Sequence, residues 1–195
     1  MLSADPKYRL YPTLLNTYDR FEKGLITQEE LVARINRLPS TPTEAQIKGT
    51  SFEDAAIKGI GEEDYDYRIL AKVRALLPRP MVKTQVYCEY QLENILLYGY
   101  VDVIGKMMAA DIKTTARYTP GSYLQSHQNF YLPALRSKGI RMLRYIITDF
   151  EDVYAEEYDH TIDLTFQEEQ ARRFCEFLDL ARPDITDQRI FGSYL

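Results

Sequence analysis

The chain contains 195 residues, with 29 Asp and Glu against 24 Lys and Arg, which gives a formal net charge of −5. Hydrophobic residues make up 45% of the chain and charged residues 27%. This balance excludes a disordered chain and predicts one soluble globular domain with a substantial core. No apolar run approaches the ~20 residues of a membrane-spanning helix, so we expect no membrane association.

The pattern of the first 80 residues predicts helices. Apolar residues recur at helical spacing, and the first helix ends at Gly24, which fits a C-cap. Thr27 and Glu30 have the spacing of a capping box at the start of the second helix. A linker rich in Pro, Ser and Thr is expected at 39–46. The expected helices cover residues 11–24, 27–38, 50–59 and 64–77, the last one ended by Pro78 and Pro80.

Residues 81–115 change to a strand pattern, rich in β-branched and aromatic residues with partial alternation. The short link at Gly105-Lys106 suits a hairpin turn that needs positive φ. Three consecutive strands are expected at 81–92, 94–105 and 106–115.

The remaining residues predict a helix, a strand and a final helix. The helix expected at 120–139 bends or ends locally at Pro133 and is capped by Gly139. A strand at 141–150 follows. The final helix covers 165–181 and begins with Thr165 and Glu168, in the spacing of a capping box.

This order predicts an α/β fold, more closely an α+β mixed sheet covered by helices, with a strand–helix–strand crossover. Residues 1–195 are expected to form a single domain. Within it, 1–45 form a helical extension, 46–150 the core, and 151–195 a C-terminal helix and tail.

Three charged residues lie in apolar strand sequence. Asp111 and Lys113 are two apart, so their side chains project from one face, and the hairpin register brings Asp102 near Asp111. Neighbouring carboxylates repel, and a Mg²⁺ ion, which takes one or two carboxylates plus water and phosphate oxygens, removes the conflict. The alternative is that Asp111 and Lys113 form a surface ion pair worth ~0–1 kcal/mol.

Charge is distributed unevenly along the chain. Residues 106–144 hold seven Lys or Arg against one acid, whereas 149–187 hold thirteen acids against three Arg. This asymmetry permits a basic, phosphate-facing surface on an acidic protein, although two solvated helix faces would give the same counts. The two cysteines, Cys88 and Cys175, are typical of a reducing cytoplasm and exclude a four-cysteine metal site.

The segments GYVDVIG, AADIKTT and YLQSHQNFYLPAL resemble the core of the PD-(D/E)XK nuclease superfamily, closest to its RecB-type and phage exonuclease branches. The resemblance covers residues 46–150 and implies the restriction-endonuclease-like core αβββαβ. The proline of the family name is absent, because Val101 precedes Asp102.

The resemblance implies roles for individual residues. Asp102 and Asp111 match the metal-binding carboxylates, and Lys113 matches the lysine that positions or activates the attacking water. Gln128 and Tyr131 are similar to the Gln–Tyr motif of RecB-type nucleases, although that motif more often has three intervening residues where this chain has two. Gln125 is therefore an alternative partner.

Glu53 matches the acidic residue that many relatives carry on the first core helix, as a third metal ligand. Thr50 and Glu53 also have the spacing of a capping box, which would engage that carboxylate with backbone, and Asp54 is the substitute ligand. Arg117 and Lys106 are expected to bind the nucleic acid strand together with Gln128 and Tyr131.

The resemblance thus implies a Mg²⁺- or Mn²⁺-dependent deoxyribonuclease with one or two ions, in the cytoplasm of a bacterium or phage-infected host. It favours an exonuclease in recombination, repair or phage DNA metabolism that leaves 5′-phosphate and 3′-hydroxyl ends. The expected partner is DNA, with scope for a separate helicase or recombinase and for a homo-oligomer. The alternatives are a non-catalytic nucleic-acid-binding or assembly protein that keeps the fold, and an RNA-directed nuclease. His127 is expected to be a structural or surface residue, with substrate contact as the alternative, and His160 to lie in a loop. Two histidines are too few for a zinc site.

Overall fold

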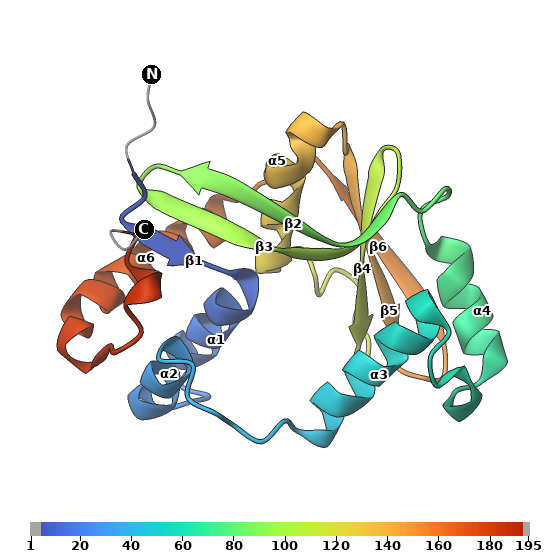
Figure 1. Ribbon diagram of the computed structural model, residues 1–195, viewed down its shortest axis with the longest axis horizontal. Coiled ribbons are helices and arrows are strands. Elements are labelled where there is room, and N and C mark those ends of the chain that lie inside the picture. The colour runs from blue at the N-terminus through green and yellow to red at the C-terminus, as the bar shows by residue number, and fades with distance from the viewer. Residues whose placement is uncertain (1–4, 193–195) are drawn as a thin grey trace.

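A six-stranded mixed sheet runs through the computed structural model, which describes residues 5–192 (Figure 1). The central strand, β3, pairs antiparallel with β2 along one edge and with parallel β1 and antiparallel β4 along the other. β4 continues into parallel β5, and β5 into antiparallel β6. The predicted mixed α/β class is confirmed. The strands are β1 (Tyr8–Leu10), β2 (Lys83–Leu92), β3 (Ile95–Ile104), β4 (Met108–Thr114), β5 (Met142–Thr148) and β6 (Val153–Asp159).

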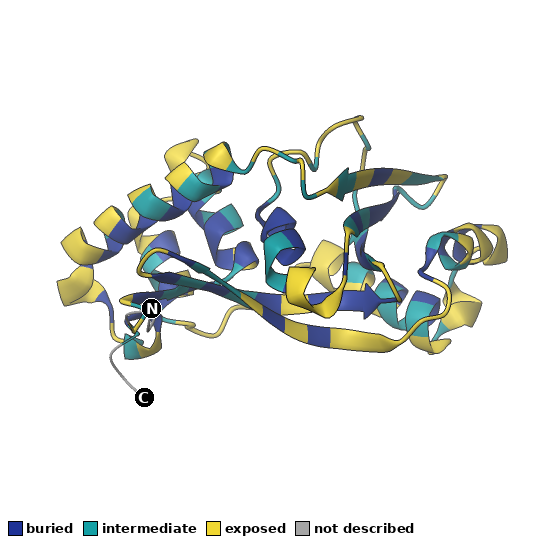
Figure 2. Cartoon of the chain, turned by 90° about the horizontal axis from the view of Figure 1, so that it is seen from above, coloured by how far each residue is buried: buried dark blue, intermediate teal, exposed yellow. Residues whose placement is uncertain are grey.

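The six α-helices pack in three groups (Figures 1 and 2). α1, α2 and α6 enclose one buried cluster with β1, α3 and α4 enclose a second, and α5 covers the sheet between them. Within residues 5–192, none of the helices is long and apolar enough to span a membrane. Their bounds are α1 (Pro12–Glu22), α2 (Gln28–Ile35), α3 (Glu44–Lys58), α4 (Tyr67–Leu76), α5 (Tyr131–Leu135) and α6 (Thr165–Leu180).

β1 is short and is held by residues from the far end of the described chain. Tyr8 forms an antiparallel bridge with Phe191, and the Gly192 N–H donates to the Lys7 carbonyl at 2.9 Å. A Cβ on Gly192 would lie 1.6 Å from the Pro6 carbonyl oxygen, so only glycine permits this approach.

α3 begins earlier than the sequence predicts. Thr43 is its N-cap and forms a complete capping box with Gln46, so the segment predicted as a linker already contains the first helical turn. Thr50 and Glu53 lie inside the helix. The capping-box alternative for Glu53 is therefore wrong, and its carboxylate is free for other contacts.

The predicted helix over 120–139 is wrong in its first half. Helical structure begins only at His127, as a 3₁₀ turn that leads into α5. The preceding loop is held by the buried Glu156 of β6, whose carboxylate accepts the Gly121 and Tyr123 N–H groups at 2.8 and 3.1 Å. A side chain thus satisfies backbone donors that a helix would otherwise use.

Three further predictions need correction. β6 was not predicted, because as an edge strand it carries mostly polar residues and buries only Glu156. Thr165 does not cap α6, because its own N–H donates to Asp163 at 2.9 Å. Gly105 is not among the positive-φ residues. It is needed for space, since a Cβ there would lie 2.6 Å from the Pro78 Cβ.

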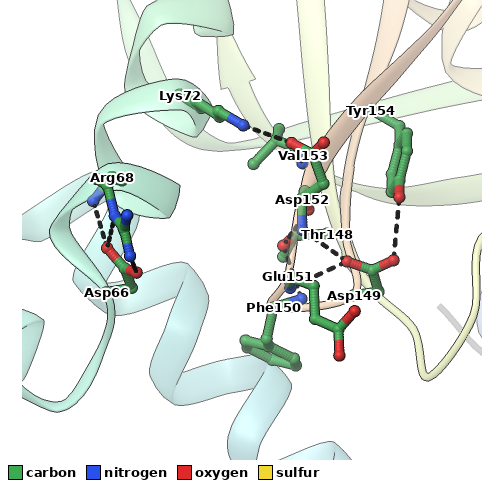
Figure 3. Close-up of polar contacts among 10 residues, drawn as sticks. All are labelled: Asp66, Arg68, Lys72, Thr148, Asp149, Phe150, Glu151, Asp152, Val153 and Tyr154. Atoms are coloured by element: carbon green, nitrogen blue, oxygen red, sulfur yellow. Dashed lines mark hydrogen bonds and ion pairs between the residues drawn. The ribbon is translucent and has the colours of Figure 1, made fainter.

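The turn between β5 and β6 is a compact hydrogen-bonded unit tied to α4 (Figure 3). Asp149 accepts the N–H groups of Glu151 and Asp152 at 3.0 and 2.8 Å, and its other oxygen accepts the Tyr154 hydroxyl at 3.2 Å. Lys72 of α4 donates to Asp152 at 2.5 Å. The turn therefore projects Phe150, at φ 70°, in a fixed direction.

Phe150 packs against α3 in a cluster of three aromatic side chains. The rings of Phe52 and Phe150 lie 5.3 Å apart, edge to face, and Phe52 meets Tyr65 in the same way at 5.1 Å. The Lys48 Nζ lies 3.6 Å from the Phe150 ring centroid. These contacts fix the rotation of α3 about its axis, and with it the direction of Glu53, the residue after Phe52.

We predict that Phe52→Ala lowers the free energy of unfolding by about 3–5 kcal/mol, because Phe52 is fully buried and its removal leaves a cavity. Urea denaturation measures the loss. The control is Tyr67→Ala, since Tyr67 is 77% exposed and its removal should change stability by less than ~0.5 kcal/mol. Equal effects of the two substitutions would contradict the anchoring role of Phe52.

Candidate active site

The Asp102 carboxylate takes the place of a backbone hydrogen bond between β3 and β4. These strands pair only at Val103–Ala110 and Ile104–Ala109. One step further they diverge, and the Asp102 Oδ2 accepts the Ile112 N–H at 2.7 Å. The sequence predicted that the hairpin brings Asp102 and Asp111 together, and the structure places them together by this side-chain bridge.

Asp111 is almost completely buried and shares one lysine with Asp102. The Lys113 Nζ lies 2.5 Å from the Asp111 Oδ2. Within the described residues, this ion pair is the polar contact of the buried Oδ2. The Asp111 side chain is 3% exposed, which excludes the surface ion pair left open by the sequence. Two buried carboxylates thus face one cation.

This arrangement shifts the protonation of the site. Burial raises the pKa of Asp102 to about 8, and the charge on Asp111 adds to the effect. Burial also raises the pKa of Glu53, again with a contribution from Asp111. For Lys113, burial works to lower the pKa, but the two aspartates outweigh it and raise the pKa above its usual value. Lys113 therefore does not compensate the carboxyl groups when all of them are charged, and the protonated form of Asp102 is favoured.

Glu53 approaches the aspartates through Gln85 of β2, which sequence reasoning missed. The Gln85 Nε2 donates to the Glu53 Oε1 at 2.7 Å and reaches the Asp102 Oδ1 at 3.4 Å. Gln85 has φ 49°, and the β2–β3 ladder skips Gln85 and Asp102. Asp54, the substitute ligand, instead pairs with Lys58 at 2.7 Å.

Tyr131 lies beside the carboxylates, packed against Gly99. A Cβ on Gly99 would lie 2.9 Å from the Tyr131 Cε1, so glycine makes room for the ring. The Tyr131 hydroxyl donates to the Tyr100 carbonyl at 3.0 Å. Burial raises the pKa of Tyr131, and Asp111 and Asp102 act in the same direction. The phenol therefore stays protonated as a donor next to the site.

Gln128 points toward α1 in this arrangement. Its Oε1 accepts the Ser126 hydroxyl at 2.6 Å and the Asn16 Nδ2 at 3.4 Å. The adjacent His127 contacts Asn16 as well, through Nδ1 at 2.7 Å, and burial lowers the pKa of His127 to about 4. Gln125 is exposed in the preceding turn. The two residues of the predicted Gln–Tyr motif therefore make separate contacts: Gln128 contacts α1, and Tyr131 contacts β3.

The basic candidates flank the site from opposite ends of β4. Lys106 lies in the turn before β4 and Arg117 after its end, and both are exposed. His160 contacts the Ile140 carbonyl through Nε2 at 3.0 Å.

Two stacked tyrosine rings lie on the β5 side of Asp111. Tyr145 is its pairing partner on β5 and is fully buried, with its hydroxyl donating to Asn129 at 2.8 Å. Tyr123 stacks on Tyr145 with ring centroids 4.7 Å apart. Sequence reasoning did not single out these residues, although parallel pairing of β4 with β5 would have indicated Tyr145 as a neighbour of Asp111.

The donor set suits a hard divalent cation. Within residues 5–192, no three Asp, Glu, His or Cys side chains by themselves form a metal-binding group. Mg²⁺, however, takes one or two protein carboxylates and completes its shell with water and substrate oxygens. Asp102 and Asp111 provide such a pair, and the Lys113 Nζ on the Asp111 Oδ2 shows that this oxygen already binds a positive charge.

We predict that Asp102→Asn stabilises the protein in EDTA at pH 7.5 by roughly 1–4 kcal/mol, because the amide oxygen still accepts the Ile112 N–H and the side chain needs no proton uptake on folding. The unfolded chain releases the Asp102 proton near pH 4 and the folded chain at about 8. The free energy of unfolding of the unsubstituted protein therefore falls as pH rises through this window, and the variant should show a flatter profile.

Chemical denaturation between pH 4 and 8.5 measures both effects. Asp54→Asn is the matched control, since its carboxylate pairs with Lys58 at the surface, and should change stability by no more than ~1 kcal/mol. A variant Asp102→Asn that is less stable than the unsubstituted protein at every pH would contradict the electrostatic analysis.

Comparison with family models and with curated proteins gave no match. Solved structures share the fold. The crystal structure of a putative exonuclease from Eubacterium rectale superposes with a TM-score of 0.60 at 10% identity, over 92% of this chain and 83% of the other. SSO0001 superposes with a TM-score of 0.50 at 13% identity, over 89% and 78%. At these identities the likeness establishes a shared nuclease-like fold, with a six-stranded mixed sheet and flanking helices.

Proposed function

We propose that this protein is a divalent-metal-dependent nuclease of the PD-(D/E)XK class that hydrolyses DNA phosphodiester bonds as an exonuclease. The observation that carries the proposal is the buried group of Asp102, Asp111 and Lys113 at the point where β3 and β4 diverge. A structural role explains it poorly, because burying two carboxylates against one lysine costs stability. The shared fold with an exonuclease-named structure supports the same function.

Asp102 and Asp111 would hold Mg²⁺ or Mn²⁺, with Glu53 as a third ligand once its carboxylate turns from Gln85. When bound, the ion supplies Lewis acidity toward the phosphodiester. Lys113 carries a raised pKa and stays cationic, so it would hold the attacking water and stabilise negative charge that develops on the phosphate.

Other residues would position the strand. Tyr131, held as a neutral donor, would orient a phosphate once its hydroxyl leaves the Tyr100 carbonyl. Gln128 would do the same after leaving its contacts with Ser126 and Asn16. Arg117 and Lys106, exposed at the two ends of β4, would bind phosphates on either side of the site.

A second candidate is a non-catalytic nucleic-acid-binding protein with this fold. The observation that favours it is the Gln85 amide, which occupies the space between Glu53 and Asp102. Such a protein would bind DNA with an affinity that falls steeply with salt, and would cleave none.

We predict that the protein degrades end-labelled linear DNA in Mg²⁺ or Mn²⁺ but not in EDTA, and leaves closed-circular DNA intact. Asp111→Asn should slow cleavage by roughly 10²–10³-fold or more, because it removes a carboxylate that would hold the metal ion. Lys113→Met should do the same while retaining Mn²⁺ binding. Asp54→Asn is the matched control and should cleave normally. Cutting of the circle would indicate an endonuclease, and DNA retention without cleavage in either metal would indicate the second candidate.

We predict that Glu53→Gln slows cleavage about 10–100-fold and weakens Mn²⁺ binding measured by calorimetry, because it removes the third carboxylate. Asp54→Asn on the same helix should change neither quantity. Full activity and unchanged Mn²⁺ affinity in Glu53→Gln would remove Glu53 from the site and leave a two-aspartate site.

A further inference from the structure

Tyrosines follow directly from the candidate site along β3. Side chains alternate between the faces of a strand, so Tyr98, Tyr100 and Asp102 share one face. On β2, Tyr87 is the pairing partner of Tyr100 and adds a ring to the same face. With ~3.4 Å per residue, successive side chains of this face are ~7 Å apart, so Tyr100 is the ring of β3 that lies nearest to Asp102 along the strand.

These rings and Tyr11, which follows β1, form one cluster that we call the tyrosine row (Tyr11, Tyr87, Tyr98 and Tyr100). Tyr98 lies 5.8 Å from Tyr11 and 6.5 Å from Tyr87, and Tyr87 lies 5.5 Å from Tyr100, centroid to centroid. None of these pairs stacks face to face. Tyr87 is 39% exposed and Tyr100 56% exposed, so both rings are accessible to a ligand.

The row borders an open stretch of sheet edge. β1 pairs with β3 only as far as Leu97, and β4 pairs with it only from Val103. The edge of β3 at 98–102 is therefore free of both strands. A hollow of about 440 Å³ lies there, within the size range of small-ligand sites. Its lining includes Tyr11, Arg37, Tyr98, Gly99, Tyr100 and Tyr131.

Arginines accompany the rings. The Arg37 guanidinium lies 5.6 Å from the Tyr11 centroid and donates to the Tyr98 hydroxyl at 3.1 Å, and Arg9 lies 5.7 Å from the Tyr98 centroid. Arg37 also pairs with Asp187 at 3.1 Å, so its charge is partly balanced. One acid lies among the rings: Glu89, which accepts the Tyr87 hydroxyl at 2.7 Å.

We propose that the tyrosine row binds the unpaired end of a nucleic acid strand by stacking on its bases, and delivers that strand to Asp102. Aromatic rings beside arginines bind single strands in this way, because every base has a face to stack on. In a duplex those faces are covered by neighbouring bases, so the row selects a single-stranded end. The inference rests on the proposed nuclease function and adds the form of the substrate.

Fluorescence anisotropy in EDTA tests the inference without cleavage. The probes are a 5′-labelled 12-nucleotide oligo(dT), a blunt duplex of the same length and an abasic strand with the same number of phosphates. We expect oligo(dT) to bind about tenfold more tightly than either other probe. Tyr98→Leu and Tyr100→Leu should each lower the affinity for oligo(dT) about tenfold without changing that for the abasic strand.

Two controls accompany these variants. Tyr100→Phe keeps the ring and should bind oligo(dT) normally, and Tyr67→Leu removes an exposed tyrosine on α4, away from the row, and should also bind normally. Thermal unfolding verifies that each variant is folded. Equal binding of oligo(dT) and the abasic strand, or normal oligo(dT) binding by both leucine variants, would overturn the inference.

The cleavage assay described above keeps the two proposals separate. Metal-dependent cleavage together with tyrosine-independent binding would overturn the stacking role alone. Tyrosine-dependent binding of oligo(dT) without cleavage in Mg²⁺ or Mn²⁺ would overturn the nuclease function and leave the strand-binding surface in place.

Discussion

The bond from the Ile112 N–H to the Asp102 carboxylate is the contact on which the rest of the site depends. A backbone donor inside a sheet must find a partner, and here a charged side chain provides it. The exchange lets β3 and β4 separate while keeping Asp102 fixed. The edge of β3 is then uncovered by a strand until β1, and Tyr131 packs against Gly99 in this stretch. The position of the carboxyl group and the uncovered strand edge thus come from the same local departure from regular pairing.

The surrounding structure stabilises a site that is itself unfavourable. Two carboxylates and one lysine lie against Tyr145 and Tyr131, in surroundings that disfavour charge. Rigid supports lie on both sides. The Phe52–Phe150 contact fixes α3, and Glu156 fixes the loop that leads to α5. Neither support touches the aspartates, so the fold holds the charged groups from a distance.

The sequence predicts the parts of the site that lie on regular elements. Asp102, Asp111 and Lys113 follow from strand alternation and one hairpin, and the structure brings these three together. The position of Gln85 could be predicted from the sequence in principle, because a turn at residues 93–94 sets Gln85 of β2 opposite Asp102 of β3. The backbone conformation of Gln85 could not be predicted, because no residue pattern in a strand indicates φ 49°.

Errors arose where side chains replace backbone partners or where an element lies at an edge. The 120–126 loop has helix-compatible residues, but Glu156, thirty residues later, binds its N–H groups. β6 looks like a polar tail because only one of its seven residues is buried. The direction of Gln128 depends on Asn16 of α1, a contact across more than a hundred residues that periodicity does not contain.

The bridge between Tyr8 and Phe191 has a consequence for the order in which the protein acquires structure. A ribosome releases residues from the N-terminus onward, and strands that pair locally, such as β2 with β3, form as they emerge. β1 and the helices beside it lack part of their buried cluster until α6 and Phe191 have been made. The first-made strand is thus among the last to be secured, and nascent chains would expose the apolar faces of α1 and α2 for most of synthesis.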